Sequence, residues 1–327
     1  MATTNNYEVV IVGAGPAGMC AALYTGRSML KTVVLERGIP GGELLNTEKL
    51  DDWIGEKSIL GWELAKKFED HSREFGAEYV TANVSRVTRL PDGTFETVTD
   101  DGNRYASPAV IVTAGGTPVK LGIPGEVEFA GKGVSYCAIC DGAFFKKQII
   151  AVVGGGDAAV EEADFLTRYA EKVYVVHRRD SFRASKILQQ RLFANPKIEV
   201  VWNAVTVEIV GDEQGLMNGL RVHDVVTDQV RTLDATGCFV FIGFRPNTGI
   251  IDGHFDHDEM GYIRTDTIMQ TSIPGLFAAG DLRSQLTRQV TTAVGDATTA
   301  AIAVEKYLKA RAEGGVVAPE GTGGYAI

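Results

Sequence analysis

The sequence predicts an α/β protein with two parallel β-sheet units, and two glycine-rich loops carry this prediction. The loop Gly13–Gly18 follows the apolar run Val9–Val12, and the loop Gly154–Ala159 follows the apolar run Ile149–Val153. Each loop precedes a helix-like stretch and then another apolar run. This order of strand, loop, helix and strand is typical of a Rossmann-like dinucleotide-binding domain, and here it occurs twice.

The next elements of both units follow from the hydrophobic pattern. We expect helices at Met19–Arg27 and Val160–Tyr169, and second strands at Thr32–Leu35 and Lys172–Val176. Glycines in loops of this kind allow the backbone to approach a pyrophosphate at the N-terminus of the following helix. One such loop is a weak signal, but two in matching context are a strong one. The candidate pyrophosphate-binding residues are Gly13, Gly15, Pro16, Ala17 and Gly18 in the first loop and Gly154, Gly155, Gly156, Asp157, Ala158 and Ala159 in the second.

The residues after the second strands distinguish the two ligands. Glu36 stands in the first unit at the position that His177 takes in the second, and His177 is followed by Arg178, Arg179 and Arg183. A carboxylate accepts hydrogen bonds from an unphosphorylated ribose and repels a 2′-phosphate, whereas guanidinium groups bind that phosphate in paired bonds. We therefore expect FAD at the first loop and NADPH at the second. The alternative for the arginines is a solvated charged loop.

A further flavin-binding segment is expected near the C-terminus, where the apolar run that begins at Leu276 ends in Gly280-Asp281. An Asp in this place can accept a hydrogen bond from a ribitol hydroxyl. A helix is expected from Thr287 to about Leu308, and its N-terminus can stabilise negative charge on a reduced flavin.

A pair of cysteines, Cys137 and Cys140, stands between the two loops and is followed directly by Asp141. Two cysteines at this spacing can close a reversible disulfide in which one thiol has a lowered pKa, and the acid is a candidate proton donor. Half of a zinc site has the same spacing, but the sequence has no second such pair. The nucleotide loops supply electrons, which favours a flavin- and nicotinamide-linked disulfide reductase. Cys20 and Cys238 stand alone in apolar segments and are expected to be inert core thiols.

The composition excludes several classes of function. The 327 residues carry a formal net charge of −10, so no basic excess exists to neutralise the phosphates of a nucleic acid. No apolar run reaches membrane-spanning length, and the first residues lack the basic and apolar regions of a signal peptide. We therefore expect a cytoplasmic protein that has no metal, membrane or nucleic-acid partner.

Together these motifs resemble the low-molecular-weight, NADPH-dependent thioredoxin reductases of the pyridine nucleotide-disulfide oxidoreductase family. The resemblance extends from about residue 7 to about residue 310. Its motifs are Gly13–Gly18, Gly41–Leu44, Val134–Gly142, Gly154–Ala159, His177–Ala184, Pro246–Thr248, Gly280-Asp281 and Arg288-Gln289.

The resemblance implies a homodimer with FAD, NADPH and a thioredoxin-like protein as the substrate. It implies domains of the three-layer ββα type, with an NADPH domain of residues 120–245 inserted into an FAD domain of residues 1–119 and 246–327. Cys140 would lie on the flavin side, Cys137 would attack the substrate disulfide, and Asp141 would transfer a proton. Further FAD contacts would come from Glu36, Arg37, Gly41, Gly42, Glu43, Leu44, Asp52, Val84, Ala114, Gly115, Gly280, Asp281, Arg288, Gln289 and Val290, and further NADPH contacts from Ile242 and Gly243.

Several positions depart from the family pattern. Glu43 replaces a usual Gln, Asp52–Gly55 replaces a usual Asn-aromatic-Pro-Gly, Phe244 replaces a frequent His, and Thr287 replaces a frequent Tyr. The tail from Gly314 to Ile327 lies outside the resemblance. We expect it to be flexible; the alternative places Tyr325 over the cofactor.

Other functions on the same fold stay open at this point. A flavin-dependent dithiol oxidase or a ferredoxin-fed reductase needs the cysteine pair but no nicotinamide, and the intact segment His177–Arg183 argues against both. A redox-sensing flavoprotein is the non-enzymatic alternative, but retention of both cysteines and Asp141 favours turnover. The cysteine pair and the second loop share one inserted domain, whereas the flavin belongs to the other domain. The disulfide and the nicotinamide must therefore reach the flavin in turn. This predicts a rotation of residues ~120–245 about the two linkers.

Overall fold

The computed structural model describes residues 4–47, 49–50 and 52–314. The chain divides into two compact units, one formed by Met1–Thr117 with Arg245–Ile327 and the other by Pro118–Phe244. Most of the tail discussed above, including Tyr325, lies outside the described residues.

Five parallel strands form the central sheet of the first unit. In spatial order they are β21 (Leu276–Ala278), β10 (Ala109–Val112), β2 (Val9–Val12), β3 (Thr32–Glu36) and β6 (Glu78–Thr81). Every residue of β2 and β10 is buried, as the continuous apolar runs in the sequence require. Because β2 lies inside the sheet between β10 and β3, the loop that follows it opens at the middle of the sheet's carboxyl edge.

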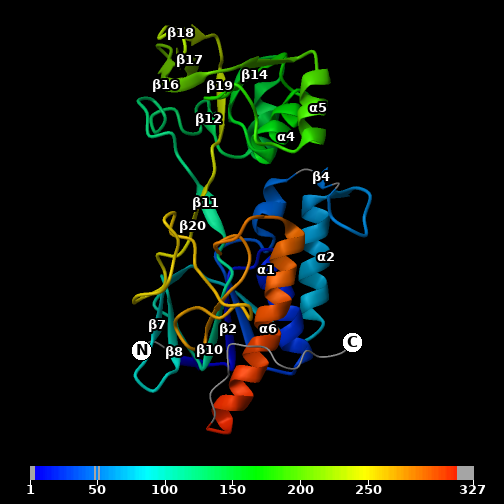
Figure 1. Ribbon diagram of the computed structural model, residues 1–327, viewed down its shortest axis with the longest axis vertical. Coiled ribbons are helices and arrows are strands. Elements are labelled where there is room, and N and C mark those ends of the chain that lie inside the picture. The colour runs from blue at the N-terminus through cyan, green and yellow to red at the C-terminus, as the bar shows by residue number, and fades with distance from the viewer. Residues whose placement is uncertain (1–3, 48, 51, 315–327) are drawn as a thin grey trace. The chain divides into compact units, whose positions relative to one another are not determined.

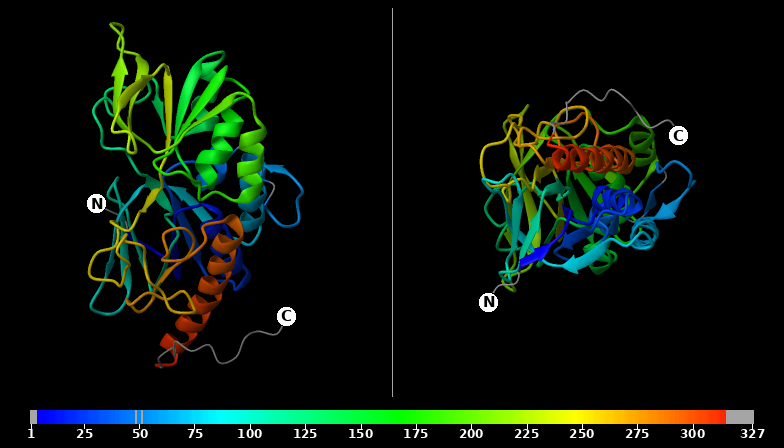
Figure 2. Two further views of the ribbon diagram at one scale, coloured as in Figure 1. Left: turned by 45° about the horizontal axis from the view of Figure 1, so that its top comes forward. Right: turned by 90° about the horizontal axis from the view of Figure 1, so that it is seen from below.

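Helices cover one face of this sheet, and a second sheet covers the other. The helices are α1 (Pro16–Arg27), α2 (Gly61–Arg73) and α6 (Val290–Ala312), and Figures 1 and 2 show them side by side. The second sheet consists of β1 (Thr4–Asn6), β9 (Arg104–Ser107), β8 (Phe95–Thr99) and β7 (Val84–Arg89). Ile11 and Phe277 belong to the core under the helices, whereas Val10 and Phe95 belong to the core between the sheets.

The second unit repeats this plan. Its parallel sheet runs in the order β12 (Val134–Ser135), β19 (Gly237–Phe241), β13 (Ile149–Gly154), β14 (Lys172–Val176) and β15 (Ile198–Val201). Strand β13 lies between β19 and β14 as β2 lies between β10 and β3. The repeat in the sequence is therefore a repeat in the structure.

Both faces of the second sheet are covered as well. On one face lie α3 (Ala138–Asp141), α4 (Asp157–Leu166) and α5 (Lys186–Ala194), and on the other an antiparallel sheet of β16 (Ala204–Gly211), β17 (Met217–Asp224) and β18 (Val230–Leu233). Phe239 and Leu166 belong to the helical core, and Cys238 and Leu220 to the core between the sheets. The predicted fold class, two Rossmann-like units of three ββα layers, is confirmed.

The chain passes between the units through two paired strands, β11 (Gly116–Pro118) and β20 (Phe244–Pro246). The backbone N–H of Val119 donates to the carbonyl of Gly243 at 2.9 Å, so the two passages run side by side. A small hairpin of β4 (Lys49–Leu50) and β5 (Ile59–Leu60) precedes α2.

The predicted helices and strands are confirmed, with shifts at their ends. Helix α1 already begins at Pro16, and α6 begins at Val290 rather than at Thr287. The later start of α6 has a local cause, because the Gln289 side chain and Thr292 form a reciprocal cap at that end. Among the described residues, no helix is both long and apolar enough to cross a membrane.

Candidate nucleotide-binding and redox sites

The loop between β2 and α1 is closed by contacts that only glycine permits. Gly13 has φ of 101°, and a Cβ there would lie 2.7 Å from the carbonyl oxygen of Thr113. A Cβ on Gly18 would lie 1.9 Å from the Gly13 oxygen. Pro16 opens the helix at a position where a missing N–H costs nothing. The next N–H groups of α1 have no acceptor within the helix, which suits them to an anionic ligand.

Glu36 joins the end of β3 to this loop. Its Oε2 accepts a hydrogen bond from the backbone N–H of Ala14 at 2.7 Å, and its Oε1 accepts one from the backbone N–H of Gly38 at 3.0 Å. A carboxylate has about four acceptor sites, so each oxygen can still accept a bond from a ribose hydroxyl.

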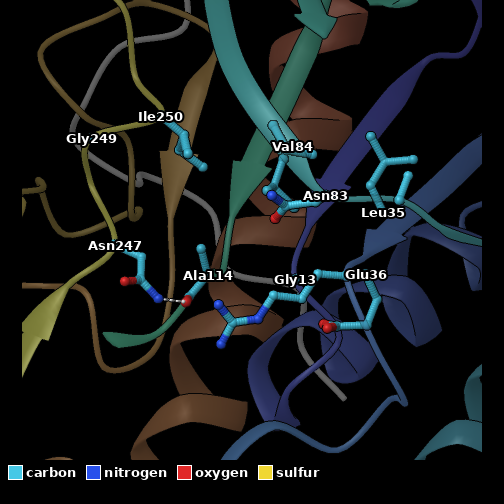
Figure 3. Close-up of a pocket in the computed structure, with 12 residues that line it drawn as sticks. Gly13, Leu35, Glu36, Asn83, Val84, Ala114, Asn247, Gly249 and Ile250 are labelled. Atoms are coloured by element: carbon cyan, nitrogen blue, oxygen red, sulfur yellow. Dashed lines mark hydrogen bonds between the residues drawn. The ribbon is translucent and has the colours of Figure 1, made fainter. Parts of the chain in front are cut away.

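A cavity of about 330 Å³ opens beside Glu36 (Figure 3). It is lined by Val12, Gly13, Leu35, Glu36, Arg37, Ala82, Asn83, Val84, Ala114, Asn247, Gly249 and Ile250. The side-chain amide of Asn247 donates a hydrogen bond to the carbonyl of Ala114 at 2.8 Å, and this bond links two segments that line the cavity. Of these residues, the sequence predicts Gly13, Glu36, Arg37, Val84 and Ala114 as contacts of the flavin cofactor.

The sequence motifs do not predict five further lining residues, which are Ala82, Asn83, Asn247, Gly249 and Ile250. Asn247 belongs to the Pro246–Thr248 motif, so a signal for it existed. Asn83 follows β6 in a loop that matches no nucleotide-binding pattern. Only the fold brings it to the carboxyl edge of the sheet.

The segment at Gly41 packs against the first loop. Gly41 donates its N–H to the carbonyl of Ala14 at 2.8 Å, and a Cβ on Gly42 would lie 3.0 Å from Gly15 Cα. Leu44 is 2% exposed and points into the protein, so its side chain contributes packing. Gly115 accepts the N–H of Asn247, whereas Asp52 lies exposed in the loop between β4 and β5.

Two carboxyl groups of this unit interact unfavourably. Desolvation raises the pKa of Asp281 to about 6, which Arg288 opposes, while Glu43 and Asp296 contribute in the same direction as desolvation. Desolvation likewise raises the pKa of Glu43, against the effects of its hydrogen bond from Asn46 and of Arg37. Glu43 is the residue that replaces the family's Gln, so this chain has an additional acid near Asp281.

The loop before α6 is held by polar contacts. Asp296 forms a salt bridge with Arg283 at 2.6 Å and also accepts the N–H of Gly280 at 3.2 Å. Both side chains of that ion pair are 12% exposed. Arg288 lies 4.0 Å above the Tyr262 ring and donates to the carbonyl of Asp281. These contacts hold Asp281 and Arg288 in the loop that leads to Gln289 and to Val290, the first residue of α6.

In the second unit, the loop after β13 is as tight as the first. A Cβ on Gly154 would lie 2.3 Å from the Phe241 carbonyl oxygen and 2.6 Å from the Ala159 Cβ. Ala159 is therefore small for the same packing reason as Gly18. Helix α4 begins at Asp157, whose Oδ1 accepts the N–H of Ser185 at 2.6 Å.

The three arginines lie in an exposed segment attached to this loop. Arg178, Arg179 and Arg183 are all exposed, and none forms a salt bridge with another residue of the described part of the chain. The backbone N–H of Arg183 donates to the Gly155 carbonyl at 2.9 Å. The guanidinium groups are thus unpaired cations beside a pyrophosphate-type loop. Ile242 and Gly243, at the end of β19, are also exposed.

His177 lies differently from the arginines that follow it. It is only 7% exposed, and both ring nitrogens face backbone carbonyls rather than solvent. Its side chain therefore supports the loop from within. The sequence identifies the residue, but it contains no information on the direction of the ring.

Cys137 and Cys140 form a disulfide, with their Cα atoms 5.3 Å apart. Cys140 is exposed, whereas Cys137 is partly buried at the start of α3, and its sulfur accepts the Cys140 N–H at 3.2 Å. Asp141 ends α3 and is partly buried.

The other two thiols have no redox partner in the described structure. Burial, together with the Glu126 carboxylate, raises the pKa of Cys238 to about 12, so it is the expected inert core thiol. Cys20 is partly buried and hydrogen-bonds to Thr298 and to the carbonyl of Val294. Among the described residues, no group of three or more His, Cys, Asp or Glu side chains could hold a metal ion.

Comparisons with known proteins agree with this geometry. Residues 7–297 match the profile of the family described as "Pyridine nucleotide-disulphide oxidoreductase". The chain is 45% identical to a thioredoxin reductase of Bacillus subtilis over 303 residues, which is 93% of this chain and 95% of that protein.

Solved structures give the same result. The Lactococcus lactis thioredoxin reductase superposes with a TM-score of 0.90 and 42% identity, covering 93% of this chain and 99% of that one. The T. acidophilum thioredoxin reductase gives a TM-score of 0.88 and 34% identity, covering 92% of this chain and 98% of that one. The resemblance drawn from the motifs is confirmed.

Proposed function

Because this chain belongs to the pyridine nucleotide-disulphide oxidoreductase family, among the thioredoxin reductases, we propose that it reduces thioredoxin with electrons from NADPH. FAD would receive the electrons from NADPH and pass them to the Cys137–Cys140 disulfide. The observation that carries the proposal is this disulfide, held in the same unit as a nucleotide loop with three unpaired arginines.

The first unit supports FAD as the bound flavin. Glu36 has acceptor sites left on both oxygens. The close packing of Gly13 against Thr113 and of Gly18 against Gly13 gives the tight turn that a pyrophosphate-binding loop of this kind needs. Asp281 would accept a ribitol hydroxyl, and the first turn of α6 would face the isoalloxazine. When bound, the flavin supplies a carrier that accepts a hydride and releases two electrons to a disulfide.

The second unit supports NADPH over NADH. A 2′-phosphate carries about two negative charges at pH 7, and Arg178, Arg179 and Arg183 provide the cations to bind it. An NADH-specific loop would carry an acid in this position, as Glu36 does in the first unit.

The cysteines themselves then perform the disulfide exchange. With two electrons and two protons the Cys137–Cys140 bond opens to two thiols. The Cys137 thiolate attacks one sulfur of the thioredoxin disulfide, and the other sulfur leaves as a thiolate. Cys140 then attacks Cys137 in the mixed disulfide, which closes the Cys137–Cys140 bond and releases the thioredoxin dithiol. Asp141 would move the proton that the leaving thiolate and the attacking thiol exchange.

Chain order supports a rotation of the second unit during turnover. The cysteine pair and the nucleotide loop both belong to residues 118–244, whereas the proposed flavin site belongs to the other unit. The disulfide and the nicotinamide must therefore take turns at the flavin. Two paired strands, β11 and β20, are the connections about which this movement would occur.

The alternatives are less well supported. If the protein were a dithiol oxidase or a ferredoxin-fed reductase, the exposed arginine segment would have no role. If it were only a redox sensor, the Cys137–Cys140 disulfide would not need to turn over. We further propose a homodimer on the basis of the family resemblance. We place the reaction in the cytoplasm, where reductants keep a catalytic disulfide cycling.

A direct assay tests the proposal. The purified protein is mixed with NADPH or NADH, with and without oxidised thioredoxin, and flavin absorbance and free thiols are followed. We expect bleaching by NADPH and stoichiometric thioredoxin reduction, with NADH at least tenfold less effective. Bleaching by NADH alone would refute the nicotinamide assignment. Bleaching without thiol formation would refute the reductase assignment.

A further inference from the structure

Both ring nitrogens of His177 face oxygens that can only accept a hydrogen bond. Nδ1 lies 2.9 Å from the Gly154 carbonyl oxygen, and Nε2 lies 3.0 Å from the Ser181 carbonyl oxygen. A neutral imidazole carries a single N–H, whereas an imidazolium carries two. Only the protonated ring therefore satisfies both contacts at once.

These two carbonyls belong to the two halves of the proposed NADPH site. Gly154 opens the pyrophosphate loop, and Ser181 lies between the arginines of the following segment. The halves are also joined by the N–H groups of Arg183 and Ala184, which donate to the Gly155 carbonyl. The imidazole thus completes a set of bonds that fixes the arginine segment against the loop.

The ring has no room to turn away from these contacts. A Cβ on Gly155 would lie 2.3 Å from ring atoms, so the loop backbone lies directly on the imidazole. Phe182 and Trp202 enclose it further, with ring centroids 5.3 Å and 6.1 Å away. His177 must therefore change its protonation, and not its position, to gain the second bond.

The charged groups around the ring affect how readily His177 takes up a second proton. Burial lowers the pKa of His177, the two carbonyls raise it, and Arg178 and Arg179 lower it further. From the other elements, Asp157 at the start of α4 is bound to the Ser185 N–H, and Lys186 begins α5. Strand β15 carries Glu199, which forms a salt bridge with Lys172 of β14, and Trp202 follows the last residue of this strand. The arginines are thus the charges that oppose the imidazolium.

We propose that His177 is a positioning residue that takes up one proton from solvent when a 2′-phosphate binds between Arg178, Arg179 and Arg183. The incoming anion offsets the repulsion from the arginines, and the new N–H forms the missing bond to a carbonyl. No other bond breaks, because the proton comes from the buffer. This role rests on the proposed function, since it requires that the arginine segment binds NADPH.

Proton uptake would make selectivity depend on pH. A ligand that raises a group's pKa binds more weakly as the pH rises above the pKa of the free site, by up to tenfold per pH unit. NADPH and NADP⁺ should show this dependence. NADH and NAD⁺ lack the 2′-phosphate and should not.

Calorimetry of the oxidised holoenzyme with NADP⁺ tests the inference without any redox step. Titrations at pH 7.5 in buffers of different ionisation enthalpy give the number of protons taken up. This pH lies above the second pKa of a phosphate monoester, about 6, so the ligand itself contributes little. We expect about half a proton or more taken up per NADP⁺ and none per NAD⁺.

Two variants assign the proton. His177→Gln should abolish the uptake and weaken NADP⁺ binding about threefold to tenfold at pH 7, with NAD⁺ binding nearly unchanged. His223→Gln removes a histidine that bonds Asp228 on the far sheet of the same unit, and it should behave as wild type. If His177→Gln does not fold, a carbon-13 NMR titration of wild-type imidazoles should show one pKa rising with NADP⁺.

The outcomes separate the inference from the proposed function. Absence of NADP⁺ binding by the wild-type protein would refute NADPH as the cofactor. Tight NADP⁺ binding without proton uptake would leave that function intact and overturn the role of His177. Uptake that persists in a folded His177→Gln protein would overturn it as well.

Discussion

Glu36 Oε2 accepts a 2.7 Å hydrogen bond from the backbone N–H of Ala14, so the acid at the end of β3 is fixed to the loop after β2. The carboxylate is therefore oriented before any ribose arrives. Because the carboxylate is already ordered, its side chain loses less conformational entropy when a ligand binds.

Removing this acceptor should release the flavin. We expect Glu36→Ala to weaken FAD binding by about tenfold to a hundredfold, because a hydrogen bond to a charged acceptor contributes about 1.5–3 kcal/mol. The ratio of flavin to protein after gel filtration measures the loss. Glu63→Ala in α2 is the matched control, and FAD retention equal to that control would contradict the assignment.

Asp281 should reduce the stability of the flavin-free protein at neutral pH. Its pKa of about 6 lies above the ordinary value of 3.8, so between these values the folded state holds the proton more strongly than the unfolded state. The contribution to unfolding free energy therefore falls as pH rises from about 4 to about 6, and stays low above that.

Asp281→Asn removes this penalty. In the flavin-free protein at pH 7.5 we expect stabilisation on the order of 1–3 kcal/mol, shrinking toward zero near pH 4. Denaturation by urea at both pH values measures it, with Asp256→Asn as an exposed control. The same variant should bind FAD less tightly. A pH-independent effect would show that the carboxyl is not desolvated.

The arginine segment should determine nicotinamide choice. The double variant Arg178→Gln/Arg179→Gln should lower kcat/KM for NADPH by roughly a hundredfold or more and leave NADH nearly unaffected, because two charge-assisted phosphate contacts are lost. Arg221→Gln/Arg231→Gln removes the same charge from the β16–β18 sheet and serves as control. Unchanged NADPH preference would identify the segment as a solvated loop.

The two cysteines should differ in what they trap. Cys140→Ser keeps the Cys137 thiolate, so it should form a stable mixed disulfide with oxidised thioredoxin, visible by mass spectrometry. Cys137→Ser should form none. Both variants should lose turnover and retain FAD, while Cys20→Ser should retain activity. Trapping by Cys137→Ser instead would reverse the two roles.

Rotation of the second unit should be blocked by a covalent tether. The oxidised protein is treated with a lysine-reactive cross-linker, and molecules with a link between residues 118–244 and the rest of the chain are compared with molecules linked within one unit. We expect the first group to lose thioredoxin reduction while FAD stays bound. Full activity in a completely tethered sample would exclude the rotation.

Much of the fold could be predicted because its central strands are buried on both faces. The limits predicted for Val9–Val12 agree with the structure, since a continuous apolar run leaves little ambiguity. The outer sheets were not recognised. Strands such as β7 alternate buried and exposed residues irregularly, and β16 contains register shifts, so neither gives a clean period.

The site residues, like the strands, could be predicted where the signal is local in the sequence. Glycines and Glu36 were found because they stand at fixed offsets within one βαβ unit. Asn83 and the ring direction of His177 depend on contacts between segments that are far apart in the chain. Motif spacing contains no information on such contacts.

The hydrogen bond between Val119 and Gly243 has a consequence for synthesis of the protein on the ribosome. It brings the first and last residues of the inserted unit together, so that unit can close as soon as Phe244 has emerged. The first unit cannot, because β21 and α6 supply an edge strand and a covering helix and are translated last. We therefore expect the inserted unit to fold first, while β2 and α1 wait with exposed apolar surface for the end of the chain. Nascent chains stopped at Gln289, directly before α6, should resist protease in residues 118–244 and remain sensitive before them.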